Sequence, residues 1–157
     1  MMSSSRQSID AMGLYRDWLA LDKGTSAKLR RATTPEALLD IPAFYALVSP
    51  YGWPEQRYPL LRCVFCLTSG AITHCDDDSL TLGRALARSE KINLSRVTHL
   101  IRQDSPQDMV QLRRILIHAE PRLYWPSLAE QLTWWGKYDR RTLLEHFVLS
   151  YSANSIK

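Results

Sequence analysis

The stretch that decides the fold is SPQDMVQLRRILIHAEP, residues 105–121. Its start predicts a helix, because Ser105 can cap it, Pro106 suits the first helical position and Asp108 faces the positive end of the helix dipole. Pro121 marks the end of the segment. The apolar residues that recur in it at spacings of three and four are Met109, Leu112 and Leu116. This pattern predicts an amphipathic helix with one stripe packed against a core.

Residues typical of helix starts and ends recur on both sides of this segment. Upstream, an apolar stripe begins at Ile9 and Lys23-Gly24 is interpreted as its stop, with further starts at Thr25 and at Thr34-Pro35-Glu36. Pro42 interrupts that segment, so Ala43–Val48 is predicted to be a separate short helix, and Pro59–Ser69 to be an apolar helix closed by Gly70. The later starts are Asn93, Trp125-Pro126 and Asp139. No segment favours a strand, so we predict an all-α fold of about nine short helices in two packed helical bundles.

The stretch from Ala71 to Ser79 is predicted to be the least regular, and it sets the internal boundary. We therefore expect one domain over residues 8–151, with bundles at roughly 8–80 and 81–151. Residues 1–7 and 152–157 are expected to be flexible tails.

The amino-acid composition limits the class of protein but does not identify its function. The 157 residues carry a net charge of +4, and from Arg84 to Arg122 there are eight basic and four acidic residues. Such a surplus suits nucleic acid but is also common in proteins with other partners. No segment resembles a secretory signal or approaches the roughly 20 apolar residues of a membrane span, so we expect a cytoplasmic protein that does not bind membranes.

Two groups of polar residues could suggest metal or redox chemistry. Cys63, Cys66, His74 and Cys75 are of zinc-ligand type, but the first two lie in an apolar run, where cysteine acts as a small buried hydrophobe. A thioredoxin-like redox role for that pair is disfavoured, because such a motif begins a helix that follows a strand and no strand is predicted before Cys63. The acidic residues Asp76–Asp78 are interpreted as a solvated loop, and the histidines His99, His118 and His146 lie on separate helices. We therefore predict no enzyme activity, no metal, no cofactor and no small-molecule substrate.

Basic residues form the pattern that favours a partner. Arg84, Arg88 and Lys91 share a helix face, and Lys137 precedes the last helix. The arginine doublets are Arg30-Arg31, Arg113-Arg114 and Arg140-Arg141. We expect these residues to point away from the apolar stripes and to suit a phosphate backbone. The alternative for each is solvation or a local pair. Trp134-Trp135 could stack bases, but two aromatic residues at the end of an amphipathic helix favour a core or partner contact.

Six separated blocks, in order, give the chain a family resemblance. They are Ile9–Trp18, Asp40–Tyr45, Leu82–Ala87, Met109–Arg114, His118–Pro121 and Leu132–Lys137. In these blocks the chain resembles the CasB-type small subunit of the type I-E CRISPR interference complex, Cascade. The resemblance runs from about residue 9 to residue 149, and it departs from the family pattern between residues 54 and 79 and in both tails.

This resemblance implies a non-catalytic, all-helical subunit with a role in antiviral defence. Two copies would lie side by side in the complex, contacting the backbone subunits that hold the guide RNA and the large subunit. Their basic surface would stabilise the R-loop, through the target and displaced DNA strands, without reading sequence. The residues expected to make these contacts are Arg30, Arg31, Arg84, Arg113, Arg114, Lys137, Arg140 and Arg141, with Arg102 added.

Two other functions stay open from the residues alone. One is a helical adaptor that binds only protein, and the other is a zinc or redox domain built on Cys63 and Cys66. The favoured hypothesis also predicts that changing Arg30, Arg31, Arg113 and Arg114 together to Glu leaves the fold intact.

Overall fold

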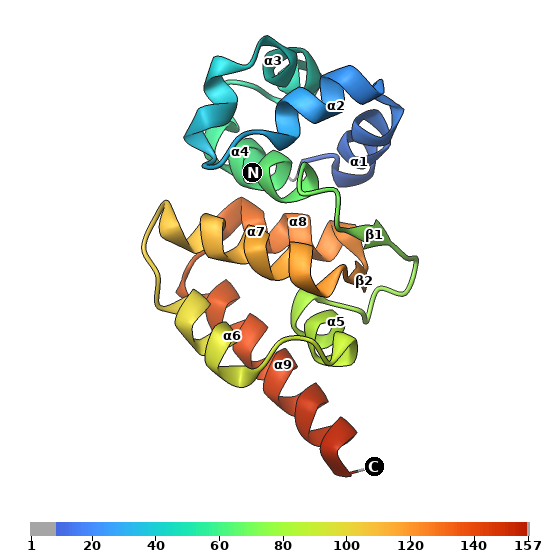
Figure 1. The fold of residues 1–157 in the computed structure, drawn as a ribbon, viewed down its shortest axis with the longest axis vertical. Coiled ribbons are helices and arrows are strands. Elements are labelled where there is room, and N and C mark those ends of the chain that lie inside the picture. Colours follow the sequence, from blue (N-terminus) through green and yellow to red (C-terminus); the bar gives the residue numbers. More distant parts are fainter. Residues whose placement is uncertain (1–8, 157) are drawn as a thin grey trace, which may run out of the picture.

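The computed structural model of the chain describes residues 9–156, and their backbone is almost entirely helical (Figure 1). The α-helices are α1 (Ala11–Ala20), α2 (Lys23–Arg30), α3 (Pro42–Val48), α4 (Arg57–Leu67), α5 (Leu82–Ser89), α6 (Leu94–Ile101), α7 (Gln107–Ala119), α8 (Trp125–Trp134) and α9 (Lys137–Ile156). Two short 3-10 helices are η1 (Glu36–Asp40) and η2 (Ser49–Tyr51), and the strands are β1 (Thr73–His74) and β2 (Arg122–Leu123). The all-α fold class with about nine helices is confirmed.

The helix start at Asn93 was predicted correctly, but the start at Asp22 was not. Asn93 accepts a hydrogen bond of 2.9 Å from the backbone N–H of Arg96, as its position before α6 predicts. Asp22 caps α2 by accepting from Thr25 at 2.7 Å. The interpretation of Lys23-Gly24 as the stop of the first helix is therefore wrong, because these residues begin the second one.

The start of α7 differs in detail from its prediction. The helix begins at Gln107, and no side chain caps it. Asp108 stays in the first turn, but it is buried there and accepts a hydrogen bond of 2.7 Å from the backbone N–H of Met109. The predicted Ser105 cap is wrong because the helix starts after Pro106 rather than with it.

The two strands are the part of the fold that the sequence pattern did not show. β1 pairs with β2 in parallel, with Thr73 opposite Arg122 and His74 opposite Leu123. The Nδ1 atom of His74 then accepts from the backbone N–H of Trp125 at 3.1 Å, at the first residue of α8. This pairing joins the predicted irregular loop to the segment before α8.

The helices are stacked in tiers around one hydrophobic core. In Figure 1, α1–α4 form the upper half, α7 and α8 cross the middle, and α5, α6 and α9 lie below. A single cluster of buried apolar residues runs through both halves, so α7 and α8 connect the two predicted bundles. The boundary near residue 80 stays a prediction, and the expected N-terminal tail lies outside the described residues.

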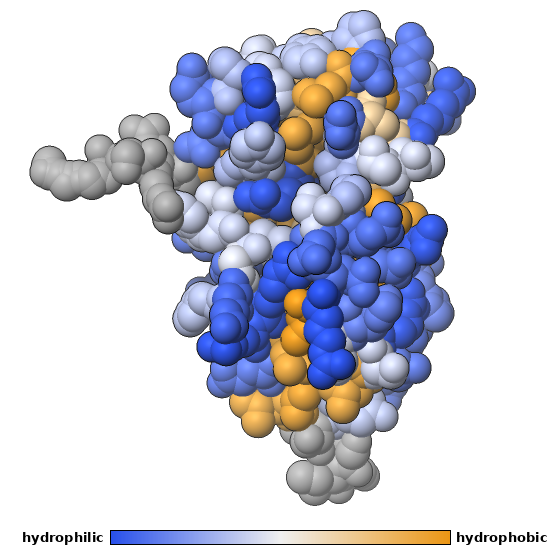
Figure 2. Space-filling model, turned by 90° about the vertical axis from the view of Figure 1, so that its left-hand side faces the viewer, coloured by the Kyte–Doolittle hydropathy of each residue, from blue (hydrophilic) through white to orange (hydrophobic). Residues whose placement is uncertain are grey.

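The last helix is longer than expected. It continues to Ile156, whereas the predicted domain ends at residue 151. Figure 2 shows that hydrophobic side chains gather at the lower end of the molecule, near the end of α9. In the described part of the chain, no helix combines the length and the apolar character that crossing a membrane requires.

Among the described residues, the most extensive contact between two helices is that of α5 with α9. Gly83 makes this approach possible, because a Cβ atom there would lie 2.6 Å from the carbonyl oxygen of Leu143 and 2.9 Å from the backbone nitrogen of Phe147. Thr81, just before α5, lies 2.8 Å from the Nδ1 atom of His146 and joins the same two helices. These contacts hold α5 against α9. Helix α6 packs against α9 and against α7.

Candidate nucleic-acid interface

Arg113 lies inside the protein, where its guanidinium binds the ends of two helices. It donates to the carbonyl oxygens of Phe65 at 2.7 Å and of Thr68 at 3.2 Å, and to the Thr68 hydroxyl at 2.9 Å, all at the end of α4. It also donates to the carbonyl oxygen of Arg30, the last residue of α2, at 3.0 Å. Helix C-termini carry unsatisfied carbonyls and partial negative charge, which a buried guanidinium satisfies. Burial lowers the pKa of the Arg113 side chain.

This position corrects one expectation from the sequence. Arg113 is only 9% exposed, and the acceptors just described hold both of its terminal nitrogens. Changing it to Glu would leave these carbonyls without donors and bury a negative charge among them, so the fourfold Glu variant would not keep its fold.

Arg113 also brings three exposed arginines to one junction. Arg30 and Arg31 end α2, whose last carbonyl Arg113 holds, and Arg114 follows Arg113 on the outer side of α7. The guanidinium of Arg30 lies 5.8 Å from the centre of the Trp18 ring. We name Arg30, Arg31 and Arg114 the α2–α7 basic cluster.

Arg140 has the same anchoring role at the start of α9. Its Nη2 atom donates to Oδ2 of the buried Asp108 at 2.9 Å, and Nη1 donates to the carbonyl oxygens of Ile101 and Gln103 at 3.1 and 2.7 Å. The indole N–H of Trp135 donates to the same carboxylate oxygen at 3.1 Å, and the guanidinium lies 5.3 Å from the centre of that ring. These contacts lock α6, α7, α8 and α9 together.

Arg140 therefore belongs to the scaffold, while its neighbours remain at the surface. Lys137 and Arg141 are exposed on the first turns of α9. Arg102 is also exposed, and it lies between the two residues whose carbonyls Arg140 holds. We name Arg102, Lys137 and Arg141 the α9 basic cluster.

Arg84 stands apart from both clusters. It is half-buried on α5 and donates to the carbonyl oxygen of Ser79 at 2.7 Å. It also helps to lower the pKa of His146, although burial is the larger cause. Of the nine predicted residues, the structure thus places six in two exposed clusters, anchors two inside the protein and leaves Arg84 on a separate helix.

The cysteines are poorly suited to metal or redox chemistry. Cys63 and Cys66 are fully buried in α4, and burial raises the pKa of the Cys63 thiol to about 12 and that of Cys66 further. A thiol that stays protonated at neutral pH is a weak nucleophile and a weak metal ligand. Within residues 9–151, no three side chains of the metal-binding types His, Cys, Asp and Glu converge on one point.

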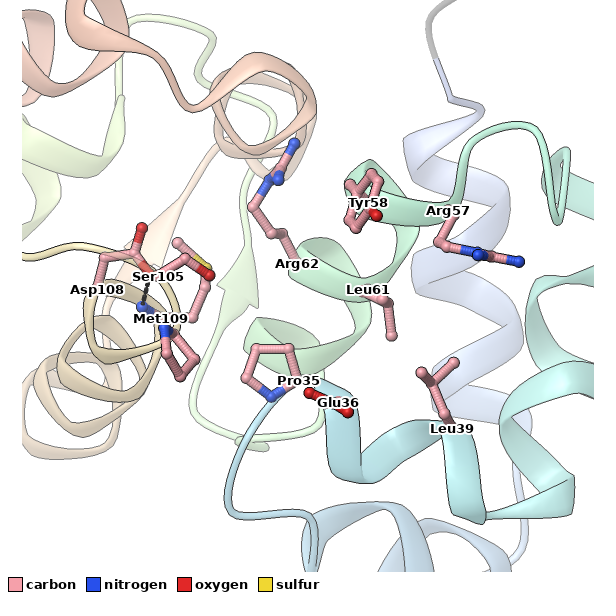
Figure 3. A pocket seen from close by; sticks show the side chains of 11 residues that line it. Pro35, Glu36, Leu39, Arg57, Tyr58, Leu61, Arg62, Ser105, Asp108 and Met109 are labelled. Atoms are coloured by element: carbon pink, nitrogen blue, oxygen red, sulfur yellow. Dashed lines mark hydrogen bonds between the residues drawn. The ribbon is translucent and has the colours of Figure 1, made fainter.

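Several residues that lie near the α9 basic cluster were not predicted from the sequence. Arg62 of α4 donates to the carbonyl oxygens of Leu132 and Thr133, at the end of α8, at 2.6 and 3.0 Å. On the same side of α4, one turn earlier, Tyr58 is exposed, and Figure 3 shows its ring beside Arg62. Tyr138 is exposed in the first turn of α9. Tyr138 does not lie on the apolar stripe formed by Leu143 and Phe147, and this position could have predicted its exposure.

The chain is similar to known proteins over most of its length. The model of the family described as CRISPR-associated protein Cse2 matches residues 25–151. The CRISPR system Cascade subunit CasB of Escherichia coli (strain K12) is 54% identical to this chain, and the matched region covers 94% of this chain and 98% of that protein. A chain in the crystal structure of E. coli Cascade bound to a PAM-containing dsDNA target superposes with a TM-score of 0.91, covering 94% of this chain and 99% of the other.

Proposed function

Because this chain belongs to the CRISPR-associated Cse2 family, we propose that it is a structural subunit of a type I-E Cascade complex that stabilises the opened DNA target. The observation that carries this proposal is its similarity, over nearly the full length of both chains, to a subunit of E. coli Cascade. The solved relative belongs to a complex bound to a double-stranded DNA target, which is the state in which such support would act.

The two basic clusters supply a physical mechanism for this role. Exchanging a DNA duplex for an RNA–DNA hybrid is nearly balanced in free energy, so modest contacts to a strand backbone shift the equilibrium towards the open state. The α2–α7 and α9 basic clusters each present three exposed cations on a scaffold that a buried arginine holds rigid. Contacts of this kind bind phosphate without regard to base sequence.

The same proposal assigns the chain no catalytic step. Its buried arginines bind carbonyl and carboxylate oxygens of the protein itself, and the thiols of Cys63 and Cys66 are protonated in the core. Stabilising an open strand requires charge and rigidity, with no bond made or broken.

Within the complex, the chain would bridge the guide-RNA backbone subunits and the large subunit beside a second copy of itself. Exposed apolar side chains suit such protein contacts, and the lower end of the molecule carries several of them (Figure 2). Those of α6 and α9 are Leu94, Val148 and Leu149. The number of copies in the reconstituted complex can be read by native mass spectrometry.

The test compares reconstituted complexes that carry variants of this subunit. The variant Arg114→Ala/Arg141→Ala removes one exposed cation from each cluster and leaves Arg113 and Arg140 in place. We expect weaker target binding and slower R-loop formation, with a loss that is largest at low salt and shrinks as salt rises, because the variant neutralises fewer phosphates and therefore has a shallower salt slope. The measurements are target affinity by filter binding and strand opening by permanganate reactivity.

The matched control is Arg16→Ala/Arg122→Ala, which removes the same charge from two exposed positions outside both clusters. This control should bind the target like the wild type. Equal binding by the cluster variant and the wild type at every salt concentration would contradict the proposed contacts and favour a subunit that binds only protein.

A further inference from the structure

We propose that exposed aromatic side chains beside the α9 basic cluster form a stacking surface for unpaired bases of single-stranded nucleic acid. This inference rests on the proposed function and deepens it, because it assigns contacts to the bases as well as to the phosphates. The aromatic residues are Tyr58, Trp134 and Tyr138, and we name them the aromatic surface.

The packing of α4 against α8 brings Tyr58 towards the start of α9. The two helices run antiparallel, since Cys63 Sγ lies 3.9 Å from the carbonyl oxygen of Ala129 while Arg62, one residue earlier, binds the carbonyls of Leu132 and Thr133. Moving towards the start of α4 therefore means moving towards the end of α8. Tyr58 lies one turn before Arg62 on the same face of α4 (Figure 3). From this order we infer that Tyr58 lies near the α8–α9 junction.

The first turns of α9 add an aromatic ring and two cations to this junction. Lys137 lies four positions before Arg141 and Tyr138 lies three before it, so Arg141 neighbours both on the surface of the helix. Arg140 faces the interior and fixes the direction of the helix through Asp108. The α9 cations and the Tyr138 ring thus stand on a rigid base.

The exposure of these rings is unusual for side chains of this size. Tyr138 is 79% exposed, Tyr58 66% and Trp134 39%. Isolated exposed aromatics need no explanation, but three at one junction form an apolar patch that marks a binding surface. Bases present flat π-faces of matching size, and every base has one, so stacking needs no particular sequence.

Charge favours nucleic acid over a protein partner at this surface. Two exposed cations, Lys137 and Arg141, lie among the first five residues of α9, and the one acid among them, Asp139, is buried and accepts from the backbone N–H of Gly136 at 3.0 Å. Arg57 adds an exposed cation beside Tyr58, 5.4 Å from the centre of the Trp53 ring. Aromatic rings interleaved with cations are the usual composition of surfaces that bind single strands.

The experiment compares two ligands that differ only in their bases. The full chain is titrated with a fluorescein-labelled thymidine oligonucleotide and with an abasic oligonucleotide of the same length, and anisotropy is recorded over a salt series. The wild type should bind the thymidine oligonucleotide roughly tenfold more tightly, because the abasic strand keeps the phosphates and loses stacking.

Two tyrosine variants test which side chains are responsible. Tyr58→Ala/Tyr138→Ala should abolish the preference for bases while leaving abasic binding and its salt slope unchanged. Tyr58→Phe/Tyr138→Phe is the matched control and should keep the preference, because stacking uses the ring and not the hydroxyl. Equal thermal stability of all three proteins would show that the fold is intact, as expected for exposed side chains.

The outcomes separate this inference from the function on which it rests. Equal, salt-dependent affinity of the wild type for both oligonucleotides would overturn the stacking surface and leave the basic contacts standing. A preference that survives the alanine changes would also overturn it, because the bases would then be bound elsewhere. Binding of neither oligonucleotide at low salt would contradict the nucleic-acid role itself.

Discussion

Two of the arginine doublets divide their work between the interior and the surface. Arg113 and Arg140 hold backbone carbonyls inside the protein, while Arg114 and Arg141 are exposed. Adjacent helix residues point about 100° apart, so one member of a doublet on an amphipathic helix faces inward when the other faces out. A doublet of this kind therefore offers one binding side chain and one structural side chain.

The variant Arg113→Met isolates the structural role. It removes the donors to Phe65, Thr68 and Arg30 while keeping an unbranched apolar side chain, so buried carbonyls lose their partners. We expect a loss of about 3 kcal/mol in the free energy of unfolding, measured by urea denaturation. Arg114→Met removes the same charge from the surface and should change that free energy by less than about 0.5 kcal/mol. Equal losses in the two variants would refute the assignment.

The sequence contained the signal that distinguishes the members of each doublet. Arg113 lies four residues after Met109 and three before Leu116, and Arg140 lies three before Leu143, so both fall on apolar stripes. The two arginines of a doublet were predicted to lie together at the surface. Their separate positions relative to the apolar stripe were therefore missed. The acceptors that hold each arginine come from residues as far as 83 positions away in the chain, and no local pattern reveals them.

At the scale of elements, Gly83 controls how closely two helices can approach. A Cβ atom at this position would meet backbone atoms of α9, which cannot rotate out of the way as a side chain can. The exposed Gly24 in α2 has no such neighbour, because a Cβ atom there would approach no closer than 3.5 Å, to a carboxylate oxygen of Asp22.

We therefore expect opposite effects from the same substitution at the two glycines. Gly83→Ala should lower the free energy of unfolding by about 1–3 kcal/mol through overpacking of α5 on α9. Gly24→Ala should raise it by up to about 1 kcal/mol, because alanine favours a helix interior more than glycine does. Thermal unfolding followed by circular dichroism compares the two variants. A Gly83→Ala protein as stable as the wild type would show that α5 can move aside.

Element type could be predicted from the sequence better than element boundaries or long-range pairs. Apolar spacing identified the helices, and Asn93 marked a start correctly because its cap acts within three residues. The parallel pairing of β1 and β2 could not be found in this way. Each strand has two residues, and their partners lie 49 positions apart, so no local periodicity exists to detect.

For the whole molecule, the continuous core predicts how the protein unfolds. Buried apolar residues of the upper and lower halves form one cluster, and α7 contacts α4 of the upper half and α6 of the lower half. The two predicted bundles should therefore not melt separately.

Cavity variants in the two halves test this expectation. Leu38→Ala in η1 and Leu143→Ala in α9 each remove a fully buried side chain and should cost about 2–5 kcal/mol. Calorimetry should show one transition in both variants, shifted to lower temperature in each. A second transition in either variant would instead support separate units at residues 8–80 and 81–151.

The family and the fold class followed from blocks spread along the sequence, and the comparisons and the structure confirm both. Which basic residues reach the surface did not follow, because exposure depends on how helices distant in sequence pack. Tyr58 and Tyr138 illustrate this limit, since they lie 80 positions apart in the sequence and our proposal relates them only through the packing of α4 against α8.

The carbonyl oxygens that accept hydrogen bonds from Arg113 have an evolutionary consequence. A lysine could not replace it, because one ammonium group does not reach acceptors from two helices with the geometry of a planar guanidinium. Selection for a folded protein alone would keep arginine at this site in every descendant. An invariant arginine here would record the architecture of the subunit and carry no information about which polyanion it meets.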